Sequence, residues 1–405
     1  MLTEHLSRRQ RELQGLSLVR SRRIAESACA PHQRVSAPGR PEREMLAFCS
    51  NDYLGLANHP ALIEALADGA RRYGAGSGAS HLISGHGRAH QGLEDDLAAW
   101  MALFIPGAQA LSFGTGYMAN LALLSTLADA ETTIFADKLN HASLVDGALL
   151  AKGTLKRYAH GNLEVLEREL ERCTTPIRLI VTDAVFSMDG DLADLPALLA
   201  LAERFDAWVI VDDAHGFGVL GAQGRGSLAH FGLSSERFIV MGTLGKAAGI
   251  GGAFVAAHPA VIDALVQTAR AYIYTTAAPP ALAHALRTSL RLIGSGEGDV
   301  RRRHLNALVA TLRSRVSDLI ARRPHLGWRL ADSATAIQPL IVGDNAAALA
   351  LAASLDARGL WVPAIRPPTV SLGTARLRIT LSAAHTLDDV QRLVDALARA
   401  AGDIA

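Results

Sequence analysis

The chain has 405 residues, of which 49% are hydrophobic and 20% are charged, and its formal net charge is +1. This balance is typical of a globular protein, and the length predicts two or three domains. The near-neutral charge gives no reason to expect nucleic acid or an anionic membrane surface as a partner. No apolar run approaches the ~20 residues that cross a bilayer, and no apolar segment of a secretory signal follows Arg8, Arg9 and Arg11.

The three cysteines, Cys29, Cys49 and Cys173, are widely scattered and lack CxxC spacing. They cannot all pair within one chain, and we expect them to be reduced thiols. These features predict a cytoplasmic protein, and no sequence pattern leads us to expect a metal site.

The first segment, residues 3–25, is polar and rich in arginine, and it predicts a helix. A loop around Pro31, Pro38 and Pro41 is expected to separate this arm from the rest of the chain. We therefore expect an N-terminal helical arm over residues 1–55.

From about residue 56, apolar strands alternate with helices. Strands are predicted at 109–113, 132–136, 177–183, 207–212, 238–241 and 253–256, and helices at 88–102, 115–127, 141–150, 162–172 and 194–205. Such alternation predicts an α/β domain, here assigned to residues 56–290, with a large, mostly parallel sheet covered by helices on both faces.

After Pro279 and Pro280 the pattern changes to long helices rich in arginine, leucine and alanine, which continue to about Arg323. Strands are predicted near 337–342 and 376–381, with a closing helix from Leu387. We assign residues 291–405 to a smaller α+β C-terminal domain.

Lysine is rare in this chain, and Lys138, Lys152, Lys156 and Lys246 are its four lysines. Lys246 lies in a glycine-rich bend between two apolar segments. A desolvated amine can lose its charge and attack a carbonyl to form a Schiff base, which a guanidinium cannot do. The alternative is a lysine at a strand end whose amine extends to water.

Another apolar strand ends in Asp212, Asp213, Ala214 and His215. Ligands of open α/β sheets bind beyond the carboxyl ends of the strands, where Asp212 could pair with a protonated ring nitrogen and His215 with a neighbouring oxygen. The alternative is a helix cap or a local ion pair. The adjacent segment 216–221 matches GxGxxG, but no helix opening follows it, so we do not expect a dinucleotide site.

A glycine-rich turn with Gly114 and Gly116 lies between an apolar strand and a helix, and the free N–H groups at that helix start could hold a phosphate. Tyr117 could line a cofactor ring or pack in the core. His141 opens another helix and could stack on a planar ring or cap the helix. Ser187 follows a third strand and could reach the same crevice.

These strand-end groups are an amine that traps an aldehyde, an acid for a ring nitrogen, a histidine to stack on the ring and a helix start for phosphate. The combination fits pyridoxal 5′-phosphate (PLP) better than any other common cofactor.

Six longer segments carry a resemblance that runs over nearly the whole chain. They are residues 50–56, 74–80, 186–190, 211–216, 243–246 and 365–378. Together they resemble the α-oxoamine synthases, a family of fold type I PLP-dependent transferases. The resemblance implies an aspartate aminotransferase-like fold and a homodimer, and segment 365–378 is similar to the members that use a pimeloyl thioester.

For the cofactor, the resemblance implies that Lys246 binds the aldehyde of PLP, Asp212 pairs with the pyridine nitrogen and His141 stacks on the ring. These three are the expected catalytic residues. His215 and Ser187 would approach the phenolic side of the ring.

Three further residues, Gly116, Tyr117 and Thr243, would hold the phosphate of PLP.

For the substrates, the resemblance implies that Arg378 binds the amino-acid carboxylate, since a guanidinium fork matches a carboxylate. Without the neighbouring motif, Arg378 would be read as a surface cation. Asn51 would lie near the same substrate, as would His141, while Arg20 and Thr369 would face the acyl substrate.

The implied reaction condenses L-alanine with a pimeloyl thioester, carried on acyl-carrier protein or coenzyme A, and releases carbon dioxide. One alternative is a glycine C-acyltransferase resembling 2-amino-3-ketobutyrate CoA ligase, because discrimination by one methyl group is worth only ~1–3 kcal/mol. The other alternative is a non-catalytic partner subunit that keeps the fold, against which Lys246 argues.

Overall fold

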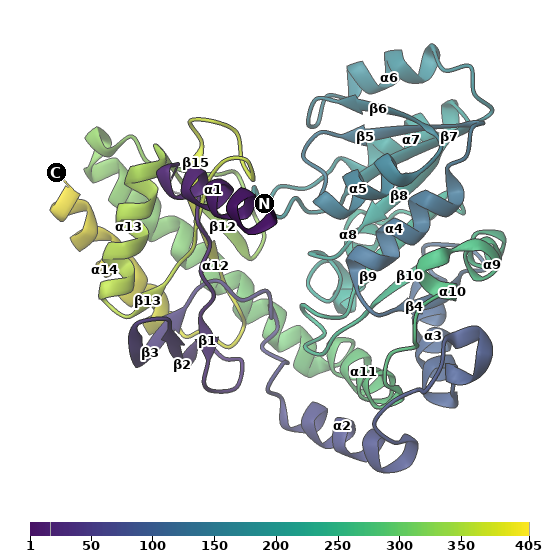
Figure 1. Cartoon of the computed structure of the whole chain (residues 1–405), viewed down its shortest axis with the longest axis horizontal. Helices are drawn as coiled ribbons and strands as arrows, with labels where there is room; N and C mark the ends of the chain where they lie inside the picture. Colours follow the sequence, from purple (N-terminus) through teal and green to yellow (C-terminus); the bar gives the residue numbers. More distant parts are fainter. Residues whose placement is uncertain (17, 405) are drawn as a thin grey trace.

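The computed structural model describes residues 1–16 and 18–404. Figure 1 shows two lobes, one built around a large central sheet and the other from the two ends of the chain. The long helix α12 (Gly296–Arg322) leads from the first lobe into the second.

The central sheet has seven strands in the order β4-β10-β9-β8-β7-β5-β6. Their bounds are β4 Gln109–Phe113, β5 Thr132–Asp137, β6 Thr154–Tyr158, β7 Ile177–Asp183, β8 Trp208–Asp212, β9 Phe238–Thr243 and β10 Ala253–Ala257. Only β10 runs antiparallel to its neighbours in this sheet, so β4 and the other five strands point the same way. The predicted mostly parallel sheet is confirmed. Strand β6 was not predicted, because its sequence TLKRY lacks a continuous apolar run.

Helices cover both faces of this sheet, as predicted. Residues Val209 and Val211 of β8 contribute to one hydrophobic cluster, and Ile210 between them contributes to the other. The first cluster includes residues of α3 (Arg88–Met101), α6 (Leu163–Glu171), α7 (Leu195–Arg204), α11 (Pro280–Ile293) and α12; the second includes residues of α4 (Gly116–Leu127), α5 (Ala142–Leu150), α9 (Pro259–Thr268) and α10 (Arg270–Ile273). Burial on both faces explains why these strands are almost continuously apolar.

The second lobe contains two four-stranded sheets, in the orders β1-β2-β3-β13 and β11-β12-β15-β14. Their strands are β1 Ile24–Ala25, β2 His32–Ala37, β3 Arg40–Ala47, β11 Arg329–Leu330, β12 Ile337–Gly343, β13 Leu360–Trp361, β14 Ala364–Ile365 and β15 Ala375–Thr380. Helices α13 (Asn345–Ala357) and α14 (Leu387–Ile404) complete this lobe. The predicted C-terminal strands and closing helix are confirmed.

The N-terminal prediction was wrong in two places. The first helix, α1 (Leu2–Gly15), is shorter than the predicted 3–25 and buries none of its residues. The expected proline loop is instead a β-hairpin, in which Pro38 and Gly39 form the turn between β2 and β3. Gly39 has φ of 73°, which a turn tolerates best at glycine.

Strand β3 pairs in parallel with β13, and this pairing ties the N-terminal hairpin to the C-terminal part of the chain. The division into units at residues 55 and 290 stays a prediction. In the described parts of the chain, no helix combines the length and the apolar character that crossing a membrane requires.

Candidate active site

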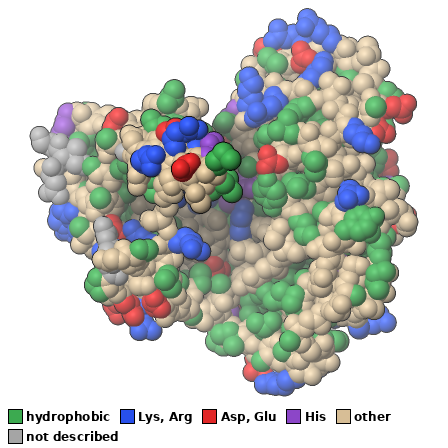
Figure 2. Space-filling view, in the orientation of Figure 1, with side chains coloured by type: hydrophobic (Ala, Val, Ile, Leu, Met, Phe, Trp, Pro, Cys, Tyr) green, Lys and Arg blue, Asp and Glu red, His purple; other side chains and the backbone are tan. Residues whose placement is uncertain are grey.

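The residues predicted to surround the cofactor gather where the parallel strands end. Figure 2 shows a hollow between the two lobes, with basic and histidine side chains on its floor. Because β4, β5, β7, β8 and β9 point the same way, the segments that follow them meet at one edge of the sheet.

Lys246 follows β9 in a tight bend that only glycine permits. Gly249 has φ of 74°, and a Cβ there would lie 2.7 Å from the backbone of Leu56 and Ala57. The close packing fixes the path of the bend. Within it, Nζ of Lys246 lies 2.8 Å from Nε2 of His215.

His215 is held from its other side by Tyr53, whose hydroxyl bonds Nδ1 and also donates to Oδ1 of Asn51 over 3.2 Å. A neutral His215 with its proton on Nδ1 satisfies this chain, because Nε2 can then accept from Lys246. Tyr53 lies in the segment 50–56, but no pattern in the sequence assigned it a role. Only the folded chain brings it to His215.

Burial sets the protonation of both bases. It lowers the pKa of Lys246 to about 8, although the charges of Asp212 and Asp183 oppose that shift. Burial also lowers the pKa of His215 well below its usual value, and the nearby charges of Lys246 and Arg378 act in the same direction. The site therefore favours an uncharged imidazole beside an amine that loses its proton readily.

Asp212 ends β8 and is almost fully buried. Its Oδ1 accepts from the backbone N–H of Ala214 at 3.0 Å, and its Oδ2 accepts from Nδ2 of Asn120 at 2.7 Å. The same Nδ2 also donates to Oγ of Ser143 at 2.9 Å. Asn120 and Ser143 thus orient the carboxylate, a role that no pattern in the sequence marked.

His141 stands at the start of α5, joined to this network through Ser143. Its Nδ1 lies 2.8 Å from Oγ of Ser143, and the ring also accepts from the Ser143 N–H as a helix cap. Its backbone N–H donates to Oδ2 of the buried Asp183 at 2.7 Å. Burial and the charge of Asp212 raise the pKa of Asp183 well above its usual value. The cap considered from the sequence is therefore present, and it leaves the imidazole exposed.

The expected phosphate site lies at the start of α4. A Cβ added to Gly116 would lie 3.4 Å from Cε of Met241 and 3.9 Å from Cβ of Thr243, so β9 approaches this turn closely. The hydroxyl of Thr115 accepts from the N–H of Met118 and caps the helix. Tyr117 is 44% exposed, and its hydroxyl bonds Asp146.

Arg378 reaches the crevice from β15 in the second lobe. Its Nε donates to the carbonyl oxygen of Ser187 at 2.6 Å, and NH1 donates to Oγ1 of Thr380 at 2.9 Å. Both terminal nitrogens lie 3.3 Å from Oδ1 of Asn51. These bonds hold the buried guanidinium in one orientation. They place Asn51 beside Arg378, as expected, and they also join Arg378 to Ser187, which was expected only beside the cofactor ring.

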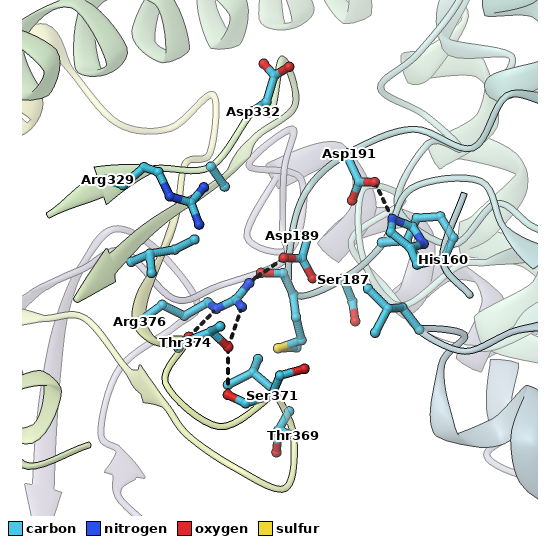
Figure 3. A pocket seen from close by; sticks show the side chains of 16 residues that line it. His160, Ser187, Asp189, Asp191, Arg329, Asp332, Thr369, Ser371, Thr374 and Arg376 are labelled. Carbon is cyan, nitrogen blue, oxygen red and sulfur yellow. Dashed lines mark hydrogen bonds and ion pairs between the residues drawn. The ribbon is translucent and has the colours of Figure 1, made fainter. Parts of the chain in front are cut away.

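A cavity of about 420 Å³ adjoins Ser187. Figure 3 shows Thr369 and Ser187 among its lining residues, and Arg376 and Arg329 also border it. Part of its wall is apolar, contributed by Leu139, Phe186, Met188 and Val370. Arg20 is exposed and does not line this cavity.

The residues present fit PLP. Close approach of β9 to Gly116 leaves a cradle at a helix N-terminus, which suits a phosphate dianion. Asp212 is fixed by two donors and still has lone pairs for a protonated ring nitrogen, and Lys246 supplies an amine of lowered pKa. Gly116, Tyr117 and Thr243 would hold the phosphate, and Asp212, His141 and His215 would surround the ring.

Comparison with known proteins agrees with this geometry. The family model for aminotransferase class I and II matches residues 43–397. An 8-amino-7-oxononanoate synthase 2 from Polaromonas sp. is 76% identical over 404 residues, and the match covers 100% of both chains.

Two solved structures share the fold. A serine palmitoyltransferase variant from S. paucimobilis with a bound PLP–myriocin aldimine has a TM-score of 0.88 at 28% identity, covering 99% of this chain and 97% of that one. An 8-amino-7-oxononanoate synthase from Francisella tularensis has a TM-score of 0.73 at 31% identity, covering 88% of this chain and 97% of that one. The chain therefore belongs to the aminotransferase class I and II family and, within it, to the 8-amino-7-oxononanoate synthases.

Proposed function

We propose that this protein is a PLP-dependent acyltransferase that condenses L-alanine with a pimeloyl thioester and releases carbon dioxide, forming 8-amino-7-oxononanoate for biotin synthesis. The observation that carries this proposal is the arrangement of Lys246, Asp212 and Arg378 around one crevice, in a chain 76% identical to a synthase of that name. The thioester is carried on acyl-carrier protein or coenzyme A, and the carrier leaves as its free thiol when the new carbon–carbon bond forms.

Arg378 is the residue that binds and orients alanine. Its bonds to Ser187 and Thr380 fix the guanidinium before substrate arrives, so a carboxylate meets a pre-oriented partner. Nζ of Lys246 is the base that takes the α-proton, because its lowered pKa leaves a neutral amine available near neutral pH.

Asp212 supplies the fixed negative charge of the site. PLP, when bound, supplies an electron sink that stabilises negative charge at the α-carbon. The bonds from Asn120 and Ala214 hold the Asp212 carboxylate in one orientation, in which it would pair with the ring nitrogen of PLP and favour the protonated form of that nitrogen. His215, uncharged and bonded to Tyr53, positions Lys246 Nζ.

The cavity beside Ser187 suits the acyl substrate. Its apolar wall matches the methylene chain of a pimeloyl group, and Thr369 offers a hydroxyl at its edge.

We also propose that the protein works as a homodimer in the cytoplasm. Ile83 is 80% exposed and Tyr274 is 73% exposed, and an isolated β-bridge between Ser80 and Thr276 links the two segments. Large exposed apolar side chains on neighbouring segments are typical of interfaces. Sedimentation of the purified protein would measure the mass, and a monomer at micromolar concentration would contradict the dimer.

The function is tested by supplying PLP-loaded protein with L-alanine and pimeloyl-CoA. We expect 8-amino-7-oxononanoate by mass spectrometry and one carbon dioxide for each thioester consumed. Glycine with acetyl-CoA forms the parallel assay, and a higher kcat/KM for that pair would show a glycine C-acyltransferase instead. Absence of turnover with both pairs would identify a non-catalytic subunit.

A further inference from the structure

His160 lies after β6, outside the residues considered so far, and bonds two carboxylates at once. Its Nδ1 lies 3.1 Å from Oδ2 of Asp137, and its Nε2 lies 2.8 Å from Oδ2 of Asp191. Figure 3 shows the ring beside Asp191 at the edge of the cavity. The ring also meets Phe186 edge-on, with centroids 4.3 Å apart.

Both ring nitrogens face acceptors, so both must carry a proton for each bond to form. The hydrogen bonds to Asp137 and Asp191 raise the pKa of His160 to about 10, against the opposing effect of burial. His160 is therefore a fixed cation that joins two loops across the physiological pH range.

Asp191 closes the turn that carries Ser187. Within this turn the N–H of Phe186 donates to the carbonyl of Asp191 at 3.0 Å, and the N–H of Gly190 donates back to Phe186 at 2.7 Å. The carbonyl of Ser187, one residue beyond Phe186, accepts the 2.6 Å bond from Arg378 Nε. The position of the Arg378 guanidinium thus depends on the path of this turn.

The same turn makes further contacts with the second lobe. Asp189 pairs with NH1 of Arg376 at 2.5 Å, and the carbonyl of Gly190 accepts from the hydroxyls of Ser333 and Thr335. These contacts hold the turn from the side of β15, whereas His160 holds it from the side of the central sheet.

Asp137 gives His160 a rigid anchor. Its carboxylate accepts from the N–H groups of Leu139 and Gly161, at 2.7 and 3.0 Å, and it is 2% exposed. A buried carboxylate with three partners has little freedom to follow the histidine, so the turn with Asp191 must adapt to His160.

We propose that His160 is a positioning residue for Arg378: by linking Asp191 to the anchored Asp137, it sets the turn whose Ser187 carbonyl orients the guanidinium. The inference rests on the proposed function in one respect, namely that Arg378 binds the carboxylate of alanine. His160 borders the cavity proposed for the acyl substrate, and it acts on Arg378 through the turn that carries Ser187.

His160→Gln removes one of the two bonds, because one amide cannot bridge both carboxylates. We expect the KM for L-alanine to rise about tenfold, since a displaced guanidinium loses its paired bonds. The KM for pimeloyl-CoA should rise less than the KM for L-alanine, although His160 also borders the cavity proposed for the acyl chain. His325→Gln, at an exposed histidine, is the matched control and should leave both constants unchanged. Asp191→Asn keeps the shape of the turn and should raise the alanine KM in the same direction.

A double-mutant cycle separates positioning from general destabilisation. Arg378→Lys removes the fork, and His160→Gln added to it should then raise the alanine KM by less than twofold, because its effect acts through the missing guanidinium. An independent tenfold rise in the Arg378→Lys background would overturn the proposal.

A measurement made without substrate tests the positioning role of His160 separately from the proposed enzymatic function. The Arg378 Nε–H of the PLP-loaded protein should exchange with solvent at least about tenfold faster in His160→Gln, because its bond to Ser187 opens. Unchanged exchange would overturn the positioning role even in an active enzyme. Faster exchange in a protein that fails to condense alanine with pimeloyl-CoA would support the positioning role and refute only the proposed function.

Discussion

Nζ of Lys246 lies 2.8 Å from Nε2 of His215, and burial lowers the pKa of both groups. A positive charge on either one disfavours a charge on the other, so the neutral imidazole accepts a hydrogen bond from the amine. The pair gives the crevice a base that is ready near neutral pH.

Lys246→Ala should abolish turnover while leaving the fold and some non-covalent PLP binding, because Asp212 and the phosphate cradle do not depend on the amine. Borohydride reduction of the PLP-loaded wild-type protein should attach the label at Lys246. Peptide mapping checks this assignment, and a label on Lys138, Lys152 or Lys156 would refute it.

The stability of the cofactor-free protein should depend on the protonation of Lys246. The folded pKa of about 8 lies below the ordinary 10.5, so at pH 7 the folded state carries a buried charge that it disfavours. This cost, at most about 3 kcal/mol, is fully present below pH 8 and disappears as the pH rises to 10.5.

The variant Lys246→Met removes that charge and keeps a similar volume. We expect it to be more stable than the wild type at pH 7, with the difference shrinking between pH 8 and 10.5. Urea unfolding of both cofactor-free proteins at several pH values measures the difference. A difference that does not vary with pH would show that Lys246 has no lowered pKa.

Asp212→Asn should lower kcat by about 100-fold or more, because a neutral amide cannot hold a proton on the ring nitrogen. The shape is retained, so PLP should stay bound. Asp213→Asn is the matched control, because the Asp213 carboxylate accepts hydrogen bonds from Ser227 and has no proposed role at the ring nitrogen. Its replacement should lower the melting temperature and leave kcat nearly unchanged. Equal losses of kcat in the two variants would contradict the assignment of Asp212.

Arg20→Ala should raise the KM for the acyl substrate. It should not alter the change that alanine causes in the visible absorbance of the PLP-loaded protein. The physical reason is the free carboxylate of a pimeloyl group, whose desolvation without a cationic partner is costly. Arg22→Ala, at another exposed arginine of the same segment, is the control. Wild-type acyl kinetics in Arg20→Ala would contradict this role and show that Arg20 is a solvent-exposed cation with no part in substrate binding.

The sequence by itself determined the large sheet and the strand ends. Apolar runs such as 177–183 are buried on both faces, so local composition alone marks them. The polar groups lie at or just after the strand ends: Asp212 ends β8, Lys246 follows β9 and His141 follows β5. The hairpin of β2 and β3 was missed because its prolines were read as loop markers, although Pro38 and Gly39 only form its turn.

Only the tertiary structure decided which distant residues meet. Tyr53 and His215 are 162 positions apart, and Arg378 and Ser187 are 191 positions apart, yet each pair shares a hydrogen bond. Such contacts depend on how the lobes close over the strand ends, and no periodicity in the sequence encodes that closure. The role of His160 could not be predicted from the sequence for the same reason. Its two carboxylate partners become neighbours only when β5, β6 and β7 align in the sheet.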